Sequence, residues 1–194
     1  MSRAADALTL VRLAAGVALP VALARSVDRS GAAWTPVGLW TVGAATDLLD
    51  GPLARRLGGG TRHGAFLDSA ADVVFVLGAA VAGVAVGMLS AWVPAAIAVA
   101  VGAYAVASLG TRSGPAARAY TPVGHAAGVC NYLLAGLLAA AVARPAWRPL
   151  LDGAQIAVVA VNVAAALVQA AAVVKRARAR RGAERPGRSA HSPA

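Results

Sequence analysis

The amino-acid sequence predicts an all-α integral membrane protein with six transmembrane helices. Hydrophobic residues make up 59% of the 194 residues and charged residues only 13%, and the mean hydropathy is +0.67. Soluble domains contain about 25% charged residues, so this composition argues against a soluble protein. The apolar residues form continuous runs of the length that a helix needs to cross a bilayer. A transmembrane β-barrel would instead alternate apolar and polar residues.

The first three apolar segments are delimited by polar residues. Residues 7–24 form the first segment, which only Arg12 interrupts, and we expect a retained helix here rather than a cleaved signal peptide. Residues 33–49 form the second segment, which ends in a pair of aspartates. The third segment begins at residue 65 and carries two further aspartates in its opening turns.

The last three segments cover residues 91–109, 123–143 and 153–174. The connection 87–90 is short and uncharged, which predicts a tight antiparallel hairpin between the third and fourth helices. Asn131 and Asn162 lie within predicted helices, where we expect interhelical hydrogen bonds. We interpret the single cysteine, Cys130, as a small packing residue. The tryptophans lie near predicted span ends, where aromatic rings anchor helices at the membrane interface: Trp34, Trp40, Trp92 and Trp147.

The basic residues predict the orientation. With the N-terminus in the cytoplasm, thirteen of the eighteen Lys and Arg residues fall on the cytoplasmic side and four on the opposite side. Seven of them lie in 175–188, so we expect a membrane domain of residues 1–175 and a basic tail of residues 176–194 that is disordered beyond about residue 182. Such a tail contacts anionic lipid, and we do not expect it to bind nucleic acid. The protein is therefore predicted to lie in the cell membrane with both termini cytoplasmic.

Four of the eight acidic residues lie close together between the second and third segments. Asp47 and Asp50 end one segment, Asp68 and Asp72 begin the next, and each pair shares one face of a helix. The glycines at 58–60 allow a sharp return of the chain, so two helix ends present two carboxylates each to a common space. Carboxylates in or beside a membrane are costly without a compensating positive charge. The pattern therefore predicts a cation site at the membrane surface.

The residues around the aspartates suit a phosphorylated ligand. Oxygen-rich sites favour Mg²⁺, Mn²⁺ or Ca²⁺, and four carboxylates are enough to hold two ions that bridge a diphosphate. Gly51 would let a flat ligand approach the helix backbone, and Ala54 keeps the next turn of that face narrow. Arg55 is a natural phosphate partner at the helix end. We therefore expect a polar active-site cavity on the cytoplasmic side.

The motif as a whole reads D-x2-D-G-x2-A-R-x8-G-x3-D-x3-D. Its fixed positions are Asp47, Asp50, Gly51, Ala54, Arg55, Gly64, Asp68 and Asp72. At every one of them the segment resembles the signature of the CDP-alcohol phosphotransferase family, also called CDP-alcohol phosphatidyltransferases. Eight fixed positions at set spacings make a specific motif. The six-helix layout extends the resemblance to most of the chain, and residues 8–12 also look like the family's first helix.

The resemblance implies a transferase of phospholipid synthesis. Such an enzyme would move a phosphatidyl group from CDP-diacylglycerol to a small alcohol and release CMP. The resemblance also implies two Mg²⁺ or Mn²⁺ ions, bound by Asp47, Asp50, Asp68 and Asp72, with Asp72 also acting as general base on the acceptor hydroxyl. Gly51, Ala54, Arg55 and Gly64 would line the CDP site. The family often forms homodimers through membrane helices, so a homodimer is a further expectation.

The alcohol acceptor is expected to be selected outside the motif. Arg112 and Arg118 lie in the predicted cytoplasmic loop between the fourth and fifth helices. Arg118 and Thr121 are similar to a Lys-x-x-Thr step that many phospholipid-forming members have there. These arginines would hold the phosphate of glycerol 3-phosphate or inositol 1-phosphate, the two favoured acceptors. The alternative is that they are ordinary cytoplasmic-side charges.

Two alternatives compete with the transferase. The aspartates could be solvated helix ends, or pair with the arginines at 55, 56 and 62. The protein could also be a cation-binding transporter or a non-catalytic relative, since acidic residues in membranes often line ion paths. A transporter does not explain the glycine, alanine and arginine positions of the motif. The last three predicted helices also contain no acidic residue within the span.

Overall fold

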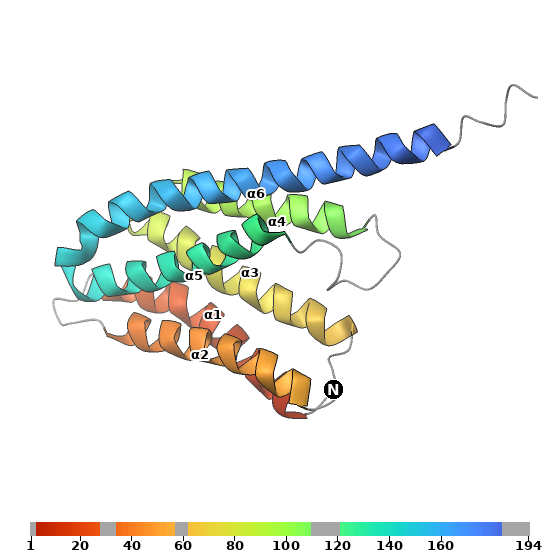
Figure 1. Cartoon of the computed structure of the whole chain (residues 1–194). Coiled ribbons are helices and arrows are strands. Elements are labelled where there is room, and N and C mark those ends of the chain that lie inside the picture. Colours follow the sequence, from red (N-terminus) through yellow and green to blue (C-terminus); the bar gives the residue numbers. More distant parts are fainter. Residues whose placement is uncertain (1–2, 28–33, 57–61, 110–120, 184–194) are drawn as a thin grey trace, which may run out of the picture.

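The computed structural model describes residues 3–27, 34–56, 62–109 and 121–183. Within these ranges the chain forms six α-helices, one short 3-10 turn and no strand (Figure 1). The elements are α1 (Arg3–Val27), α2 (Thr35–Arg56), α3 (Arg62–Ala85), α4 (Trp92–Leu109), α5 (Pro122–Ala143), η2 (Pro145–Trp147) and α6 (Arg148–Ala183). The helical fold that the sequence predicts is confirmed.

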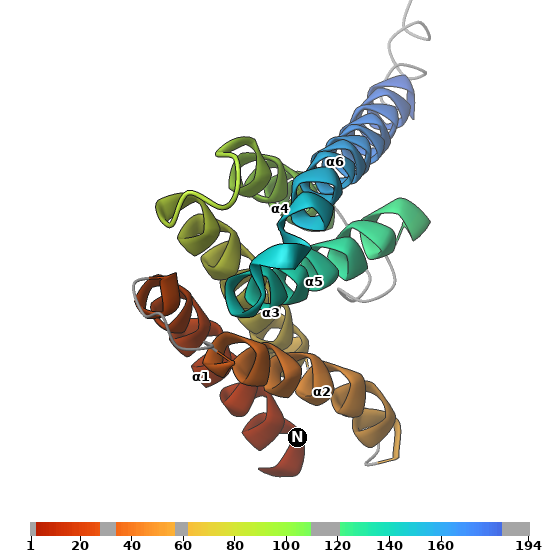
Figure 2. The same cartoon turned by 90° about the vertical axis from the view of Figure 1, so that its left-hand side faces the viewer.

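The helices pack as two pairs with two helices between them (Figures 1 and 2). Helix α1 packs against α2 and α3, and α4 packs against α6. Helix α5 contacts α6 on one side and α2 on the other, and it also touches α1 and α3. The view of Figure 2 shows α3 and α5 between the α1–α2 pair and the α4–α6 pair. Helices α2, α3 and α5 can therefore all contribute to one site.

Four helices of the described structure are long and apolar enough to cross a membrane. Their apolar stretches are Ala7–Ser26, Phe66–Ala85, Pro122–Ala143 and Pro145–Ala179, and α4 adds a shorter one, Trp92–Ser108. Helix α2 is not among them, because threonine, aspartate and arginine interrupt its apolar residues. The chain is thus a multi-pass helical membrane protein, whereas the six crossings and the cytoplasmic cavity stay predictions.

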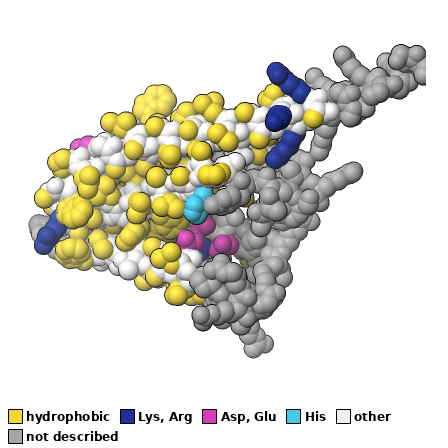
Figure 3. Space-filling model, viewed as in Figure 1, with side chains coloured by type: hydrophobic (Ala, Val, Ile, Leu, Met, Phe, Trp, Pro, Cys, Tyr) yellow, Lys and Arg dark blue, Asp and Glu magenta, His cyan; other side chains and the backbone are white. Residues whose placement is uncertain are grey.

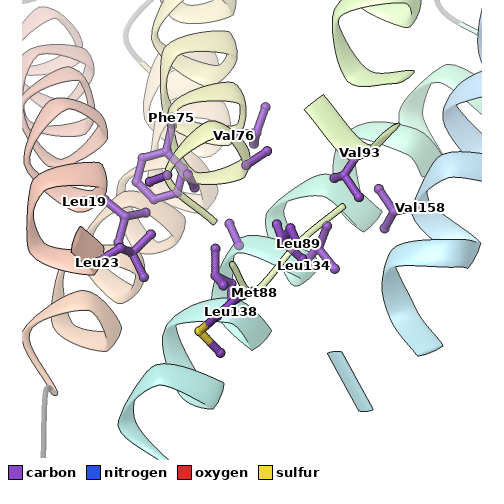
Figure 4. Packing of buried hydrophobic residues seen from close by; sticks show 14 of the residues in the cluster. Leu19, Leu23, Phe75, Val76, Met88, Leu89, Val93, Leu134, Leu138 and Val158 are labelled. Carbon is purple, nitrogen blue, oxygen red and sulfur yellow. The ribbon is translucent and has the colours of Figure 1, made fainter. Parts of the chain in front are cut away.

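The core extends from the contact of α1, α3 and α5 to α4 and α6 (Figure 4). Leu19 and Leu23 of α1, Phe75 of α3 and Leu138 of α5 are fully buried there. Alanines fill much of the remaining interior, and small residues allow membrane helices to approach closely. Large apolar side chains such as Ile156 face outward, as expected where lipid replaces water as the solvent.

Two glycines make room for aromatic side chains between helices. A Cβ atom at Gly43 of α2 would collide with the ring of Phe75. A Cβ atom at Gly136 of α5 would collide with the indole of Trp40. The absence of a side chain at both positions lets the aromatic rings lie in the contact between α2, α3 and α5.

Two features that the sequence predicts are present, and a third is present in part. The connection after α3 is short, and Gly87 adopts a left-handed φ of 68°, which glycine tolerates without strain. The two helices that it joins do not form a tight hairpin, because α4 packs mainly against α6 and contacts α3 much less. Asn131 and Asn162 form reciprocal side-chain hydrogen bonds of 3.3 and 2.7 Å between α5 and α6. Cys130 packs, partly buried, against the core.

Two features differ from expectation. Trp40 was expected to anchor α2 at the membrane interface, but its Nε1 donates a 2.9 Å hydrogen bond to the Tyr132 carbonyl oxygen within the bundle. The space beside Gly136 accounts for this inward position. Helix α6 continues to Ala183, so it extends past residue 175, where the membrane domain is predicted to end. Arg176 Nη1 donates a 3.1 Å hydrogen bond to the carbonyl of Ala107 near the end of α4, which supports this extension.

Candidate functional site

A buried arginine joins three of the four motif aspartates. Arg12 lies within the apolar stretch of α1, and its side chain is fully buried. Its Nη1 atom donates hydrogen bonds of 2.5 Å to Asp68 Oδ1 and 2.9 Å to Asp72 Oδ1. The same atom lies 3.3 Å from Asp47 Oδ1. One guanidinium therefore gathers carboxylates from α2 and α3.

The local helix geometry brings these groups together. Asp68 and Asp72 are four residues apart on α3, so their side chains point to the same face. Asp47 lies toward the end of α2, and α1 packs against both α2 and α3. A single long cationic side chain on α1, that of Arg12, is therefore enough to contact all three carboxylates.

The carboxylates are accessible although the arginine is not. The side chains of Asp47, Asp68 and Asp72 are 41%, 42% and 34% exposed, whereas that of Arg12 is 0% exposed. Figure 3 shows acidic side chains gathered on an otherwise largely hydrophobic face. The guanidinium thus lies on the inner side of the cluster, and the carboxylate side chains are partly exposed.

The charges of this cluster do not balance. Three ionised carboxylates and one guanidinium sum to −3 + 1 = −2 for the described side chains. An uncompensated charge in a region of low dielectric is unfavourable and is reduced by a bound cation. In the described part of the cluster the carboxylates therefore outnumber their positive partner.

Tyr132 of α5 adds a second donor to Asp72. Its hydroxyl donates a 2.7 Å hydrogen bond to Asp72 Oδ1, the oxygen that also accepts from Arg12. Its ring stacks on Phe75, with centroids 5.2 Å apart and an interplanar angle of 15°. Asp72 is thus the aspartate that contacts side chains from two other helices.

The remaining predicted site residues are placed only in part. Asp50, Gly51, Ala54 and Arg55 belong to α2, and Gly64 belongs to α3, but their side chains lie outside the part of the structure that is described. Arg112 and Arg118 lie outside the described residues altogether. The proposed acceptor contacts therefore stay predictions.

The donor chemistry of the cluster fits a hard divalent cation. Mg²⁺ and Mn²⁺ prefer carboxylate oxygens, and three such groups converge here. In the described structure no three His, Cys, Asp or Glu side chains by themselves form a group that could hold an ion. The point on which Asp47, Asp68 and Asp72 converge is taken by Arg12 Nη1, and the side chain of Asp50 is not described. The residue types thus suit a metal, without the described set being a complete coordination shell.

Sequence reasoning missed two residues of the site. Arg12 carried a usable signal, because a lone arginine within an apolar run needs a counter-charge and the motif aspartates are the nearest set. Tyr132 carried none, because an isolated tyrosine in an apolar helix has many possible neighbours. Only the packing of α5 against α3 identifies its partner.

The fold and the cluster together define a multi-pass helical membrane protein with a carboxylate-rich site between helices. The chain belongs to the CDP-alcohol phosphatidyltransferase family, whose family model matches residues 3–174. Members are CDP-alcohol phosphotransferases that generally depend on a divalent metal. Searches among curated proteins and among solved structures gave no match.

Proposed function

We propose that the protein transfers a phosphatidyl group from CDP-diacylglycerol to a small phosphorylated alcohol and releases CMP. Glycerol 3-phosphate and inositol 1-phosphate are the favoured acceptors. The observation that carries this proposal is the convergence of three partly exposed aspartates, Asp47, Asp68 and Asp72, on the buried guanidinium of Arg12, in a chain that belongs to a family of such transferases. These three aspartates occupy motif positions on two different helices.

The cluster is suited to a diphosphate only if a cation is added. Asp47, Asp50, Asp68 and Asp72 would hold two Mg²⁺ or Mn²⁺ ions. Bound ions would neutralise charge on the diphosphate and on the departing CMP. Arg12 keeps the aspartates of α2 and α3 together from the buried side. Gly51, Ala54, Arg55 and Gly64 would line the CDP moiety.

Asp72 is the proposed general base. In the reaction, the acceptor oxygen forms a bond to the phosphorus that carries diacylglycerol, while the bond from that phosphorus to the CMP oxygen breaks. The hydroxyl proton passes to the Asp72 carboxylate, and CMP leaves with the electron pair. Asp72 is the least exposed of the three described aspartates, and its Oδ1 is fixed by two donors. A fixed carboxylate is favourable for proton removal, because orientation contributes strongly to general base catalysis.

The acceptor site is proposed to include Arg112 and Arg118. Both would bind the acceptor phosphate through charge-assisted hydrogen bonds. Substituting each by glutamine should raise the KM for the phosphorylated acceptor while leaving the KM for CDP-diacylglycerol nearly unchanged. An equal rise in both constants would contradict an acceptor role.

The cytoplasmic orientation of both termini is likewise a proposal, which the asymmetry of the basic residues supports. A homodimer is a further proposal, which the small residues of the helices support.

The function is tested by CMP release from the purified full-length protein in lipid nanodiscs. The assay contains CDP-diacylglycerol, Mg²⁺ or Mn²⁺, and one acceptor from a panel that includes glycerol 3-phosphate and inositol 1-phosphate. We expect metal-dependent CMP release with one acceptor and formation of the matching phospholipid. Folded protein that binds Mn²⁺ but releases no CMP with any acceptor would contradict the transferase and favour a cation-binding role.

A further inference from the structure

We propose that Tyr132 is a positioning residue that fixes the Asp72 carboxylate for its work in the site. The inference rests on the proposed role of Asp72 as metal ligand and base. It concerns a residue of α5, about 60 positions from the aspartate motif, that no motif position predicts.

The first support is the pattern of contacts at Asp72. Tyr132 Oη and Arg12 Nη1 both donate to Oδ1, at 2.7 and 2.9 Å. Two donors from different helices restrict rotation of the carboxylate about its last side-chain bond. With Oδ1 engaged in this way, Oδ2 is the oxygen that we assign to the ligand. Partners of this kind are important for groups that bind metals or transfer protons, because they set the orientation of the reacting atom.

The second support is that Tyr132 is itself held in place. Its ring stacks on Phe75, a fully buried residue of α3, and its carbonyl oxygen accepts the 2.9 Å hydrogen bond from Trp40 of α2. Gly43 leaves space for the Phe75 ring, and Gly136 leaves space for the Trp40 indole. The hydroxyl therefore points at Asp72 from a ring that α2 and α3 keep fixed.

The third support comes from the neighbouring residue on α5. Asn131 makes the buried hydrogen bonds that tie α5 to α6, so α5 has a separate polar contact that stabilises its packing. The hydroxyl of Tyr132 instead bonds to a carboxylate that is 34% exposed. Because this carboxylate is partly exposed, water competes for the same acceptor and lowers the contribution of the hydrogen bond to folding. Its main effect is on the orientation of Asp72.

The test compares Tyr132→Phe with the wild type in the full-length protein. This change keeps the ring and its stacking on Phe75 and removes only the hydroxyl. We expect kcat for CMP release and Mn²⁺ affinity, measured by electron paramagnetic resonance, each to fall about 10-fold, as is typical when such an outer partner is lost. The Tm should change little. Tyr104→Phe, on the exposed surface of α4, is the matched control and should keep both values.

A double-mutant cycle separates positioning from a structural effect. If the hydroxyl acts through Asp72, then Tyr132→Phe should cause no further loss of Mn²⁺ affinity in an Asp72→Asn background. An equal loss in both backgrounds, or wild-type kcat and Mn²⁺ affinity in Tyr132→Phe, would overturn the inference. A lower Tm with unchanged kcat would do the same, because it would indicate a structural contact.

The Mn²⁺ measurement also distinguishes this inference from the proposed function. If the wild type releases no CMP but Tyr132→Phe still weakens Mn²⁺ binding through Asp72, the transferase proposal fails and the positioning role stands. If the wild type is active and Tyr132→Phe has the same kcat and Mn²⁺ affinity, the transferase proposal stands and the positioning role fails. Wild-type protein that binds no Mn²⁺ and releases no CMP would overturn both.

Discussion

Adjacent residues of α5 make polar contacts of opposite kinds. Asn131 pairs with Asn162 in a neutral, reciprocal arrangement, and both side chains are buried. Tyr132 reaches a group of three partly exposed carboxylates that shares one buried guanidinium. The amide pair is complete without any ligand. Among the described side chains the carboxylates of the cluster outnumber their positive partner, so we expect its stability and its chemistry to depend on what binds there.

The largest effect is expected from Asp72→Asn. The substitution keeps the shape of the side chain but removes the proton acceptor, so CMP release should fall about 10³-fold. Asp152→Asn, on the exposed first turns of α6, is the control and should keep wild-type turnover. Steady-state CMP release at saturating donor makes the comparison. Near-normal turnover of Asp72→Asn would contradict its role as base.

The next effect concerns the cation dependence of stability. Arg12→Met removes the only cation that the described structure places among the aspartates, and we expect a loss of about 3 kcal/mol in the free energy of unfolding. Bound Mg²⁺ would supply the missing positive charge, so Mg²⁺ should raise the Tm of this variant more than that of the wild type.

Arg148→Met is the control for Arg12→Met. Arg148 Nη2 donates a 2.9 Å hydrogen bond to the carbonyl of Gly87, where no aspartate of the cluster is involved. Its removal should leave the Mg²⁺ response of the Tm as in the wild type. Equal Mg²⁺ responses of the Tm in the wild type and in Arg12→Met would mean that the arginine and the metal do not share the carboxylates.

A smaller effect is expected at Gly136. The added methyl group of Gly136→Ala collides with Trp40, so the indole must move and α5 must repack, at a cost of about 1–3 kcal/mol. Turnover should also fall, by less than in Tyr132→Phe, since Trp40 holds the backbone of Tyr132. Gly128→Ala on the same helix has open space around the new methyl group and should be neutral or slightly stabilising. Thermal unfolding and kcat distinguish the two variants.

The smallest effect is expected from the amide pair. Asn162→Leu leaves the Asn131 amide without its partner, and we expect a loss of about 1 kcal/mol with unchanged kcat and Mn²⁺ affinity. Asn131→Leu combined with Asn162→Leu should cost less than the sum of the two single changes. A strong loss of kcat in the folded double variant would show that the amide pair also affects the reaction, and would contradict the distinction between the two kinds of contact.

The sequence predicted the parts of this site that depend on local spacing. Asp68 and Asp72 share a face because they are four residues apart. The predicted return of the chain at the glycines 58–60 lies outside the described residues. The position of Trp40 was predicted wrongly, because its location near a span end suggested the membrane interface. The space opened by Gly136, nearly a hundred residues later, decides its direction.

The contacts between distant helices were beyond prediction for a physical reason. In an apolar bundle rich in alanine, many rotations of a helix bury similar surface, so hydrophobic pattern alone does not determine which residues of α5 face α3. Arg12 could have been assigned, since only the motif aspartates offer it several counter-charges. Tyr132 required the packing itself.

Helix α6 has a practical consequence for imaging this small protein. A 36-residue α-helix is about 54 Å long, whereas the hydrocarbon core of a bilayer is about 30 Å thick. The helix is therefore longer than the hydrocarbon core that it would cross. A rigid domain fused in continuous helical register at Ala183 would turn with the bundle instead of tumbling on a linker. Such a fusion would give a 19.1 kDa membrane protein a fiducial large enough for particle alignment in electron cryomicroscopy.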